Sequence, residues 1–119
     1  MPVFAGEKRL LWTIVRAHQS DIGGGTHGAY NPAATEIFQE GLRIPPIKLY
    51  EAGKARDDLL DMLALNVRNP REFRGDLAAM LGAAQLGERR VSKLFAEFGA
   101  QVVEAAIEVA VETYEARLV

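Results

Sequence analysis

A histidine and an aspartate three residues apart are the first residues in this 119-residue chain that could do chemistry. His18 and Asp21 stand where a stretch rich in β-formers meets a glycine-rich segment, so a rigid element would hold them beside an open loop. An imidazole nitrogen with a carboxylate oxygen suits zinc, manganese or ferrous iron. A third ligand must come from elsewhere, and the nearest candidates are His27, Glu36 and Glu40. The alternative is a structural pair, in which Asp21 caps a turn and His18 donates a hydrogen bond to it.

Two glutamates four residues apart are the second chemical feature. Asn31 as an N-cap, Pro32 at the first helical position and Gly41 after the end predict a short helix over 32–40, on which Glu36 and Glu40 share a face. Such a pair can act as general acid and base if burial separates the two pKa values. Without that separation, the pair is a solvated acidic face.

The elements that would position these groups begin with extended chain. Residues 8–18 favour a strand buried on much of both faces, and the glycine-rich residues 23–28 must form a loop. Two prolines within 43–50 impose extended geometry and suit an edge strand. We therefore expect one or two strands in a strand and loop half, residues 1–55.

The second half, residues 56–119, has helical periodicity. Apolar spacing, with breaks at Pro70, Gly87 and Gly99, predicts helices over 57–69, 70–84, 88–98 and 101–118. The last of these carries an apolar stripe and an acidic opposite face, which is typical of packing against a core or another subunit, including a second copy of the chain. The sequence therefore predicts an α+β fold in a single segment with three or four helices in its second half.

Composition excludes several classes of function. The chain carries a formal charge of −2 and no dense basic cluster, which disfavours nucleic-acid binding. Its longest apolar stretches are far shorter than a membrane span. Because its start lacks the pattern of a signal peptide, we expect a cytoplasmic protein. It has no cysteine, so disulfides, thiolate zinc sites and cysteine nucleophiles are excluded.

Two stretches are longer and more specific than a generic pattern: RAHQSDIGG at 16–24 and ATEIFQEGLRIPPIKLY at 34–50. Shorter blocks follow in the order NVRNP at 66–70, GDL at 75–77, LGERR at 86–90 and FG at 98–99. Together these blocks resemble the hydantoinase B/oxoprolinase family over residues 2–115. Chains of that family are several times longer, so the resemblance covers an internal segment.

The resemblance implies a function. Members of the family are the larger partners in ATP-dependent cyclic-amide hydrolases such as N-methylhydantoinase and 5-oxoprolinase. In these enzymes an A-type subunit or domain binds ATP and phosphorylates the carbonyl oxygen or enol of the substrate. The B part then acts on that activated intermediate. We therefore expect a component of such a hydrolase, with a small-molecule substrate and with ATP on a hydantoinase A-like partner rather than on this chain.

The resemblance also implies roles for particular residues. Family members of the carboxylase kind hold a divalent metal with a His-x-x-Asp pair, which carries over to His18 and Asp21, with His27 as the third candidate ligand. A manganese, zinc or iron ion would polarise a carbonyl group or activate water. A neighbouring carboxylate, Glu40 or Glu36, would move protons.

Two other interpretations stay open at this point. The chain can belong to a related acetone or acetophenone carboxylase, because those enzymes share the family. It can also be a non-catalytic interaction module, in which the last helix and the Pro45-Pro46 segment dock onto other chains. Where the family commonly shows Pro-Gly-Ser after the glycines, this chain has His27-Gly28-Ala29, and we expect the isolated chain to be inactive.

Overall fold

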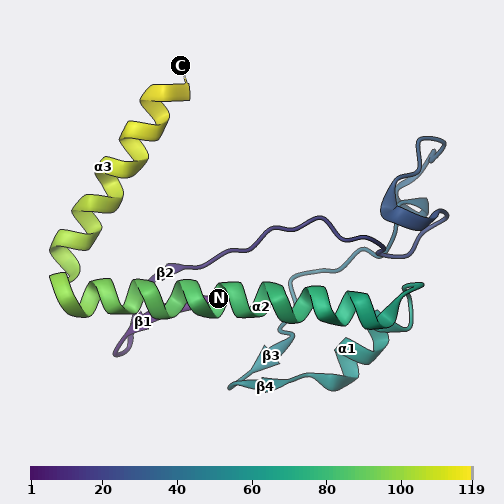
Figure 1. Cartoon of the computed structure of the whole chain (residues 1–119), viewed down its shortest axis with the longest axis horizontal. Helices are drawn as coiled ribbons and strands as arrows, with labels where there is room; N and C mark the ends of the chain where they lie inside the picture. The colour runs from purple at the N-terminus through teal and green to yellow at the C-terminus, as the bar shows by residue number, and fades with distance from the viewer. Residues whose placement is uncertain (119) are drawn as a thin grey trace. The chain divides into compact units, whose positions relative to one another are not determined.

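The computed structural model describes residues 1–118, apart from the side chain of Ala29, and divides into two compact units. The hairpin unit combines Met1–Val15 with the chain from Leu81 onward, and the glycine-loop unit is Arg16–Met80. Two antiparallel hairpins and three α-helices make up the regular structure (Figure 1). The predicted α+β fold is confirmed.

The hairpin unit begins with strands β1 (Pro2–Ala5) and β2 (Lys8–Trp12). Val3 pairs with Leu11 and is fully buried. The predicted strand over 8–18 is wrong in length and burial, because β2 ends at Trp12 and is exposed or half-buried throughout. Within residues 1–118 no strand pairs with residues 14–18, so their backbone has no ladder to join.

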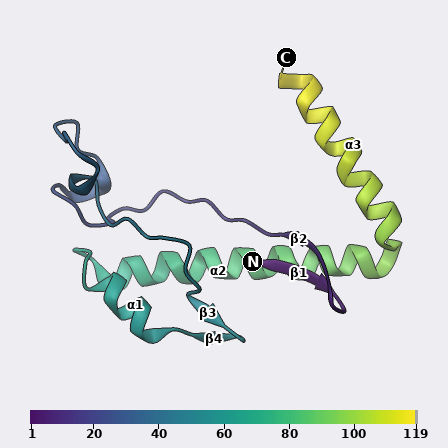
Figure 2. The same cartoon turned by 180° about the vertical axis from the view of Figure 1, so that it is seen from behind.

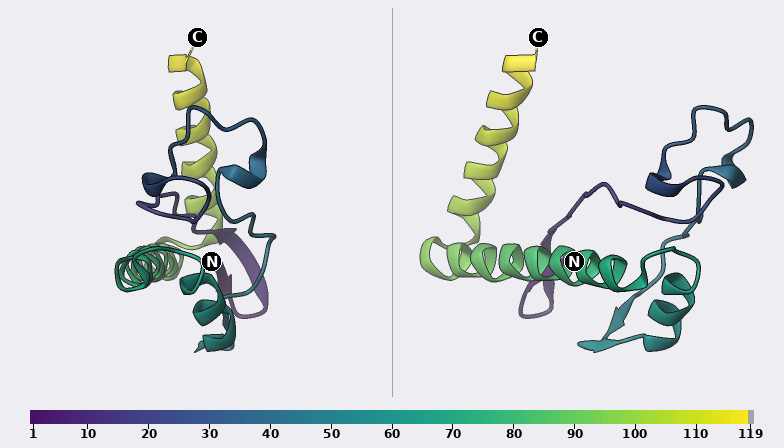
Figure 3. Two further views of the ribbon diagram at one scale, coloured as in Figure 1. Left: turned by 90° about the vertical axis from the view of Figure 1, so that its right-hand side faces the viewer. Right: turned by 45° about the vertical axis from the view of Figure 1, so that its right-hand side comes forward.

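Helix α2 (Pro70–Phe98) runs without interruption for 29 residues (Figure 3). The predicted break near Gly87 is therefore wrong. A glycine inside a helix costs only about 1 kcal/mol relative to alanine. At Gly87 the missing side chain also makes room for Thr13, whose methyl carbon would lie 3.0 Å from an added Cβ. The Thr13 hydroxyl donates to the carbonyl of Ala84 at 3.0 Å, so the hairpin is bonded to the helix at this point.

Helix α3 (Ala100–Leu118) matches the helix predicted for the end of the chain. Only Val103 among its residues is buried. Its large apolar side chains are otherwise exposed: Val102, Ile107, Val109, Val111, Tyr114 and Leu118. No helix within residues 1–118 is both long enough and apolar enough to cross a bilayer.

The glycine-loop unit carries little regular structure before residue 50 (Figure 2). Its elements are two 3₁₀ turns, His27–Ala29 and Ile37–Gln39, strands β3 (Tyr50–Glu51) and β4 (Lys54–Ala55), helix α1 (Asp57–Ala64) and the first turns of α2. Its core consists of Leu63, Ala64, Val67 and Phe73, against which Ile22, Leu42, Leu49 and Leu77 pack. The core therefore lies where the loop segments meet α1 and the start of α2.

The predicted helix over 32–40 is wrong, because only the turn Ile37–Gln39 forms and Glu36 is extended. The Asn31 side chain accepts a hydrogen bond from the Ala33 amide at 3.2 Å, and its carbonyl accepts one from Ala34 at 3.1 Å. These bonds close a single turn, which does not continue as a helix because the chain is extended again at Glu36. The extended geometry predicted for 43–50 is confirmed, with β3 beginning at Tyr50.

Two backbone segments cross inside the glycine-loop unit at a distance that leaves no room for a side chain. A Cβ on Gly24 would lie 2.6 Å from the Gln39 carbonyl oxygen, and one on Gly41 would lie 2.9 Å from the Ile22 carbonyl oxygen. The crossing is held by Gly25 N–H donating to Gln39 O and by Leu42 N–H donating to Ile22 O, both at 2.9 Å. Glycine is therefore required on both sides of the crossing.

Replacement of Gly24 by alanine should unfold this crossing. Gly24 and Gly28 share a φ of +85°, but nothing lies within 4 Å of a Cβ on Gly28. Gly28→Ala is therefore a matched control that carries only the strain of the left-handed backbone, about 1 kcal/mol. Gly24→Ala adds an overlap with backbone and should lose about 2 to 4 kcal/mol in all.

Urea unfolding measures both losses, and amide exchange at Gly25 and Leu42 reports the crossing directly. Equal losses in the two variants would contradict the close approach at Gly24.

Candidate functional site

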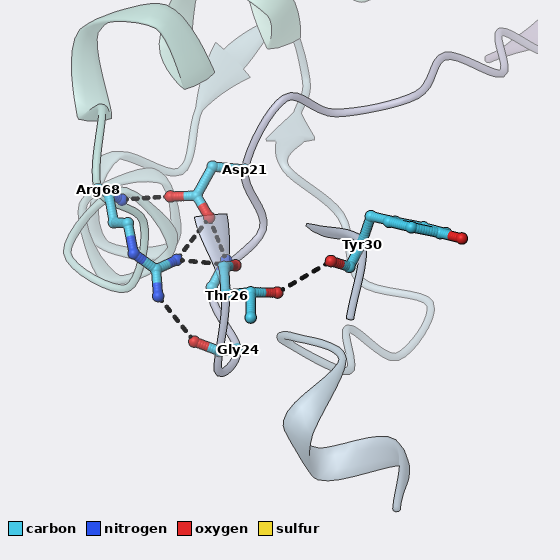
Figure 4. Close-up of polar contacts among 6 residues, drawn as sticks. Asp21, Gly24, Thr26, Tyr30 and Arg68 are labelled. Carbon is cyan, nitrogen blue, oxygen red and sulfur yellow. Dashed lines mark hydrogen bonds and ion pairs between the residues drawn. The ribbon is translucent and has the colours of Figure 1, made fainter. Parts of the chain in front are cut away.

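The carboxylate of Asp21 is the buried charge at the centre of the candidate site, with only 4% of the residue exposed. One oxygen accepts from the Arg68 backbone N–H at 2.5 Å. The other accepts from the Arg68 guanidinium at 2.9 Å and from the Gly23 amide at 3.2 Å (Figure 4). Asp21 therefore caps the turn at Gly23, as the structural alternative predicted, but His18 is not among its hydrogen-bond donors within residues 1–118. The strongest partner of Asp21 is Arg68.

Arg68 also binds the glycine loop, which we define as residues 21–28. Its guanidinium donates to the carbonyl of Gly24 at 2.9 Å and to that of Thr26 at 3.3 Å (Figure 4). The Thr26 hydroxyl in turn donates to the Tyr30 carbonyl at 3.1 Å. One arginine thus fastens the loop to the connection between α1 and α2.

Hydrogen bonding determines the charge state of Asp21. The Arg68 backbone N–H, helped by the Gly23 amide and the Arg68 guanidinium, lowers the pKa of Asp21 below its ordinary value of 3.8. Burial acts in the opposite direction, but the hydrogen bonds outweigh it. The side chain is therefore an anion at neutral pH.

The three residues predicted as metal ligands do not form a cluster. His18 and His27 are exposed, whereas Asp21 is buried against Arg68. Within residues 1–118 no group of three histidine or carboxylate side chains is placed to hold a metal ion. Both Asp21 oxygens are occupied by N–H donors, so the carboxylate in this arrangement does not fit a metal site. The metal assignment stays a prediction.

The structure brings Glu36 and Glu40 together, although not on a helix. Both line one hollow of about 470 Å³, together with Ala34, Thr35 and Ile37. Glu40 follows Gln39, whose carbonyl accepts from the glycine loop at Gly25, so the loop fixes the backbone next to this carboxylate. The hollow is open and both glutamates are exposed, which leaves them accessible to a small molecule.

Sequence reasoning missed Arg68. This arginine lies 47 residues from Asp21, beyond the reach of any local spacing rule. The one signal in the sequence is the NVRNP block, which belongs to the family pattern but carries no indication of a contact with Asp21.

A sequence profile of hydantoinase B/oxoprolinase matches residues 1–119. The chain belongs to this family. It is 42% identical over 106 residues to the caprolactamase beta subunit of Pseudomonas jessenii, covering 89% of this chain and 18% of that protein. It is 32% identical to the B-type subunit of a putative D-/L-hydantoinase from a Pseudomonas strain, covering 91% and 18%, and 32% identical to the acetophenone carboxylase delta subunit of Aromatoleum aromaticum, covering 87% and 15%.

The fold is similar to that of a solved relative. The crystal structure of the ATP-dependent caprolactamase from Pseudomonas jessenii superposes with a TM-score of 0.67 at 44% identity, over 74% of this chain and 15% of that one. The chain thus spans less than a fifth of the length of these relatives and corresponds to one segment of a caprolactamase or hydantoinase type of subunit.

Asp21→Asn tests the central ion pair. The asparagine keeps one acceptor oxygen but loses the charge that Arg68 binds, and Arg68 keeps 42% of its side chain exposed to solvent. We therefore expect a loss of about 2 kcal/mol in the free energy of unfolding, below the range for a fully buried pair. Asp76→Asn, on α2 in the same unit, is the control and should change stability little. A similar loss in both variants would mean that the ion pair with Arg68 adds nothing to the free energy of unfolding.

The lowered pKa of Asp21 predicts how stability changes with pH. A carboxyl group whose pKa is lower in the folded state stabilises the protein above its unfolded pKa, 3.8, and this contribution disappears as the pH falls through the folded value. The difference in unfolding free energy between wild type and Asp21→Asn should therefore be constant near neutral pH and shrink below 3.8. Urea titrations at a series of acidic pH values measure it. A difference that persists in acid would show that the charge is not responsible.

Proposed function

We propose that this chain forms the glycine-loop segment of a hydantoinase B-type subunit and takes part in ATP-dependent hydrolysis of a cyclic amide. The observation that carries the proposal is the hollow with Glu36 and Glu40, placed beside the glycine loop in a chain that is 42% identical to a caprolactamase subunit. The caprolactamase subunit, a hydrolase relative, is 42% identical to this chain, whereas the acetophenone carboxylase subunit is 32% identical. This difference favours hydrolysis over carboxylation.

The two carboxylates would serve the proton transfers of the reaction. Ring opening adds water to the activated carbonyl carbon, breaks the bond from that carbon to the ring nitrogen and leaves a proton on the nitrogen. A second water molecule then releases, as inorganic phosphate, the phosphoryl group that had activated the carbonyl oxygen. One glutamate can accept the proton of the attacking water while the other supplies a proton to the departing nitrogen. Glu40 is the better base candidate, because the crossing with the glycine loop fixes the backbone on both sides of it.

Activation of the carbonyl is assigned to another chain. The solved relative is named as ATP-dependent, and the caprolactamase and hydantoinase relatives are named as subunits. We propose that a hydantoinase A-like partner binds ATP and phosphorylates the substrate, and that this chain acts on the product of that step. A divalent metal supplied by the complete assembly remains a separate prediction that the position of Asp21 does not support.

A non-catalytic interaction module is the second candidate, and the exposed apolar residues of α3 favour it. The two candidates differ in whether the glutamates matter for turnover.

The test is ATP-dependent ring opening by the chain assembled with the remainder of a hydantoinase B-type subunit and its A-type partner. Glu40→Gln should lower kcat by about a hundredfold or more if Glu40 transfers a proton. Glu7→Gln, on the exposed turn of the β1–β2 hairpin, is the matched control and should leave kcat unchanged. Turnover that is indifferent to both changes would favour the interaction module.

A further inference from the structure

A second hollow of about 610 Å³ is lined by residues that adjoin those of the glutamate hollow along the chain. Its lining consists of Phe38, Gly41, Leu42, Arg43, Ile44 and Pro45. Arg43 is the one charged residue in this lining, and the rest is apolar side chain or glycine backbone. The two hollows therefore differ in charge, one acidic and one basic.

The guanidinium of Arg43 lies over an aromatic ring. Its central carbon lies 5.6 Å from the centroid of the Phe38 ring, within the range of a cation–π interaction. No carboxylate among residues 1–118 forms an ion pair with Arg43. The Phe38 ring offers no oxygen or nitrogen acceptor, so this contact leaves N–H groups of the guanidinium available for an oxyanion.

The backbone that carries Arg43 is fixed. Leu42, the residue before it, donates its amide proton to Ile22 O at 2.9 Å, and a Cβ on Gly41 would lie 2.7 Å from the Ile22 side chain. The same crossing with the glycine loop that fixes Glu40 therefore fixes the attachment point of the arginine. A cation held on a fixed backbone loses less conformational freedom on binding than a mobile one.

We propose that the Arg43 hollow is an oxyanion subsite, which takes the carboxylate or phosphoryl group of a small molecule whose apolar part packs on Phe38, Ile44 and Pro45. The inference rests on the proposed function and adds a class of ligand to it. A cyclic amide that carries a carboxylate, its ring-opened product and a phosphorylated intermediate all present such an oxyanion. Arg43 follows Glu40 by three residues along the chain, so the arginine would anchor the anion while the glutamates line the other hollow.

The test is an NMR titration of the intact 119-residue chain with matched ligands. 5-Oxoproline and 2-pyrrolidinone share a lactam ring, but only the first has a carboxylate, and inorganic phosphate represents the phosphoryl group. We expect saturable shifts of the Leu42, Arg43 and Ile44 amides with 5-oxoproline, phosphate or both, and none with 2-pyrrolidinone. A response to 5-oxoproline alone assigns the subsite to a carboxylate, and a response to phosphate alone assigns it to a phosphoryl group.

Arg43→Gln should raise the Kd for the anion by about tenfold, as expected for loss of a hydrogen bond to a charged group. Arg89→Gln removes an exposed arginine from the hairpin-unit part of α2 and is the control. An unchanged Leu42 amide in Arg43→Gln establishes that the crossing is intact. Equal binding of 2-pyrrolidinone, no response to either anion, or equal effects of the two variants would overturn the subsite.

The titration needs neither ATP nor a partner subunit, so its result is separable from the turnover experiment. Loss of turnover in Glu40→Gln with no anion binding would overturn the subsite and leave the proposed function standing. Anion binding at Arg43 without any turnover would overturn the proposed function and leave the subsite standing.

Discussion

The buried carboxylate of Asp21 is the charge on which the glycine-loop unit depends. A buried anion is costly unless hydrogen bonds replace its hydration, and all of the partners of Asp21 come from the Arg68 and Gly23 groups. Because one arginine supplies both a backbone and a side-chain donor, the carboxylate can be satisfied only when the segment before α2 lies against the glycine loop. The ion pair therefore specifies a tertiary arrangement as well as contributing to stability.

The contact between Asp21 and Arg68 also restricts the backbone that carries Glu40 and Arg43. The glycine loop is bonded to Arg68 at one point and crosses the backbone of residues 39–42 at another. Glu40 lies within the crossed segment and Arg43 is the first residue after it, so one anionic and one cationic side chain are attached to the same fixed stretch of backbone. This arrangement lets an otherwise irregular stretch of chain hold functional groups without a helix or a sheet beneath them.

The parts of this architecture that the sequence predicted are those governed by local chemistry. Glycine and proline placed the loop at 23–28 and the extended chain at 43–50, and apolar spacing placed the last helix. The helix over 32–40 was wrong: the bonds at Asn31 close only one turn, and the chain is extended again at Glu36. Glu36 and Glu40 nevertheless line one hollow, although they do so without the helix that was expected to bring them together. The sequence could not predict that Arg68 is the partner of Asp21, because periodicity carries no information about contacts between distant segments.

The crossing at Gly24 and Gly41 also limits how this segment can change through mutation. A clash between two side chains can be relieved by shortening either one, and a genetic screen then recovers second-site suppressors. At Gly24 the obstructing atoms are the Gln39 carbonyl oxygen and the backbone of residues 40 and 41, which every amino acid carries. No substitution in the facing segment removes them. A lesion at Gly24 should therefore revert only to glycine, whatever happens to the side chains around it.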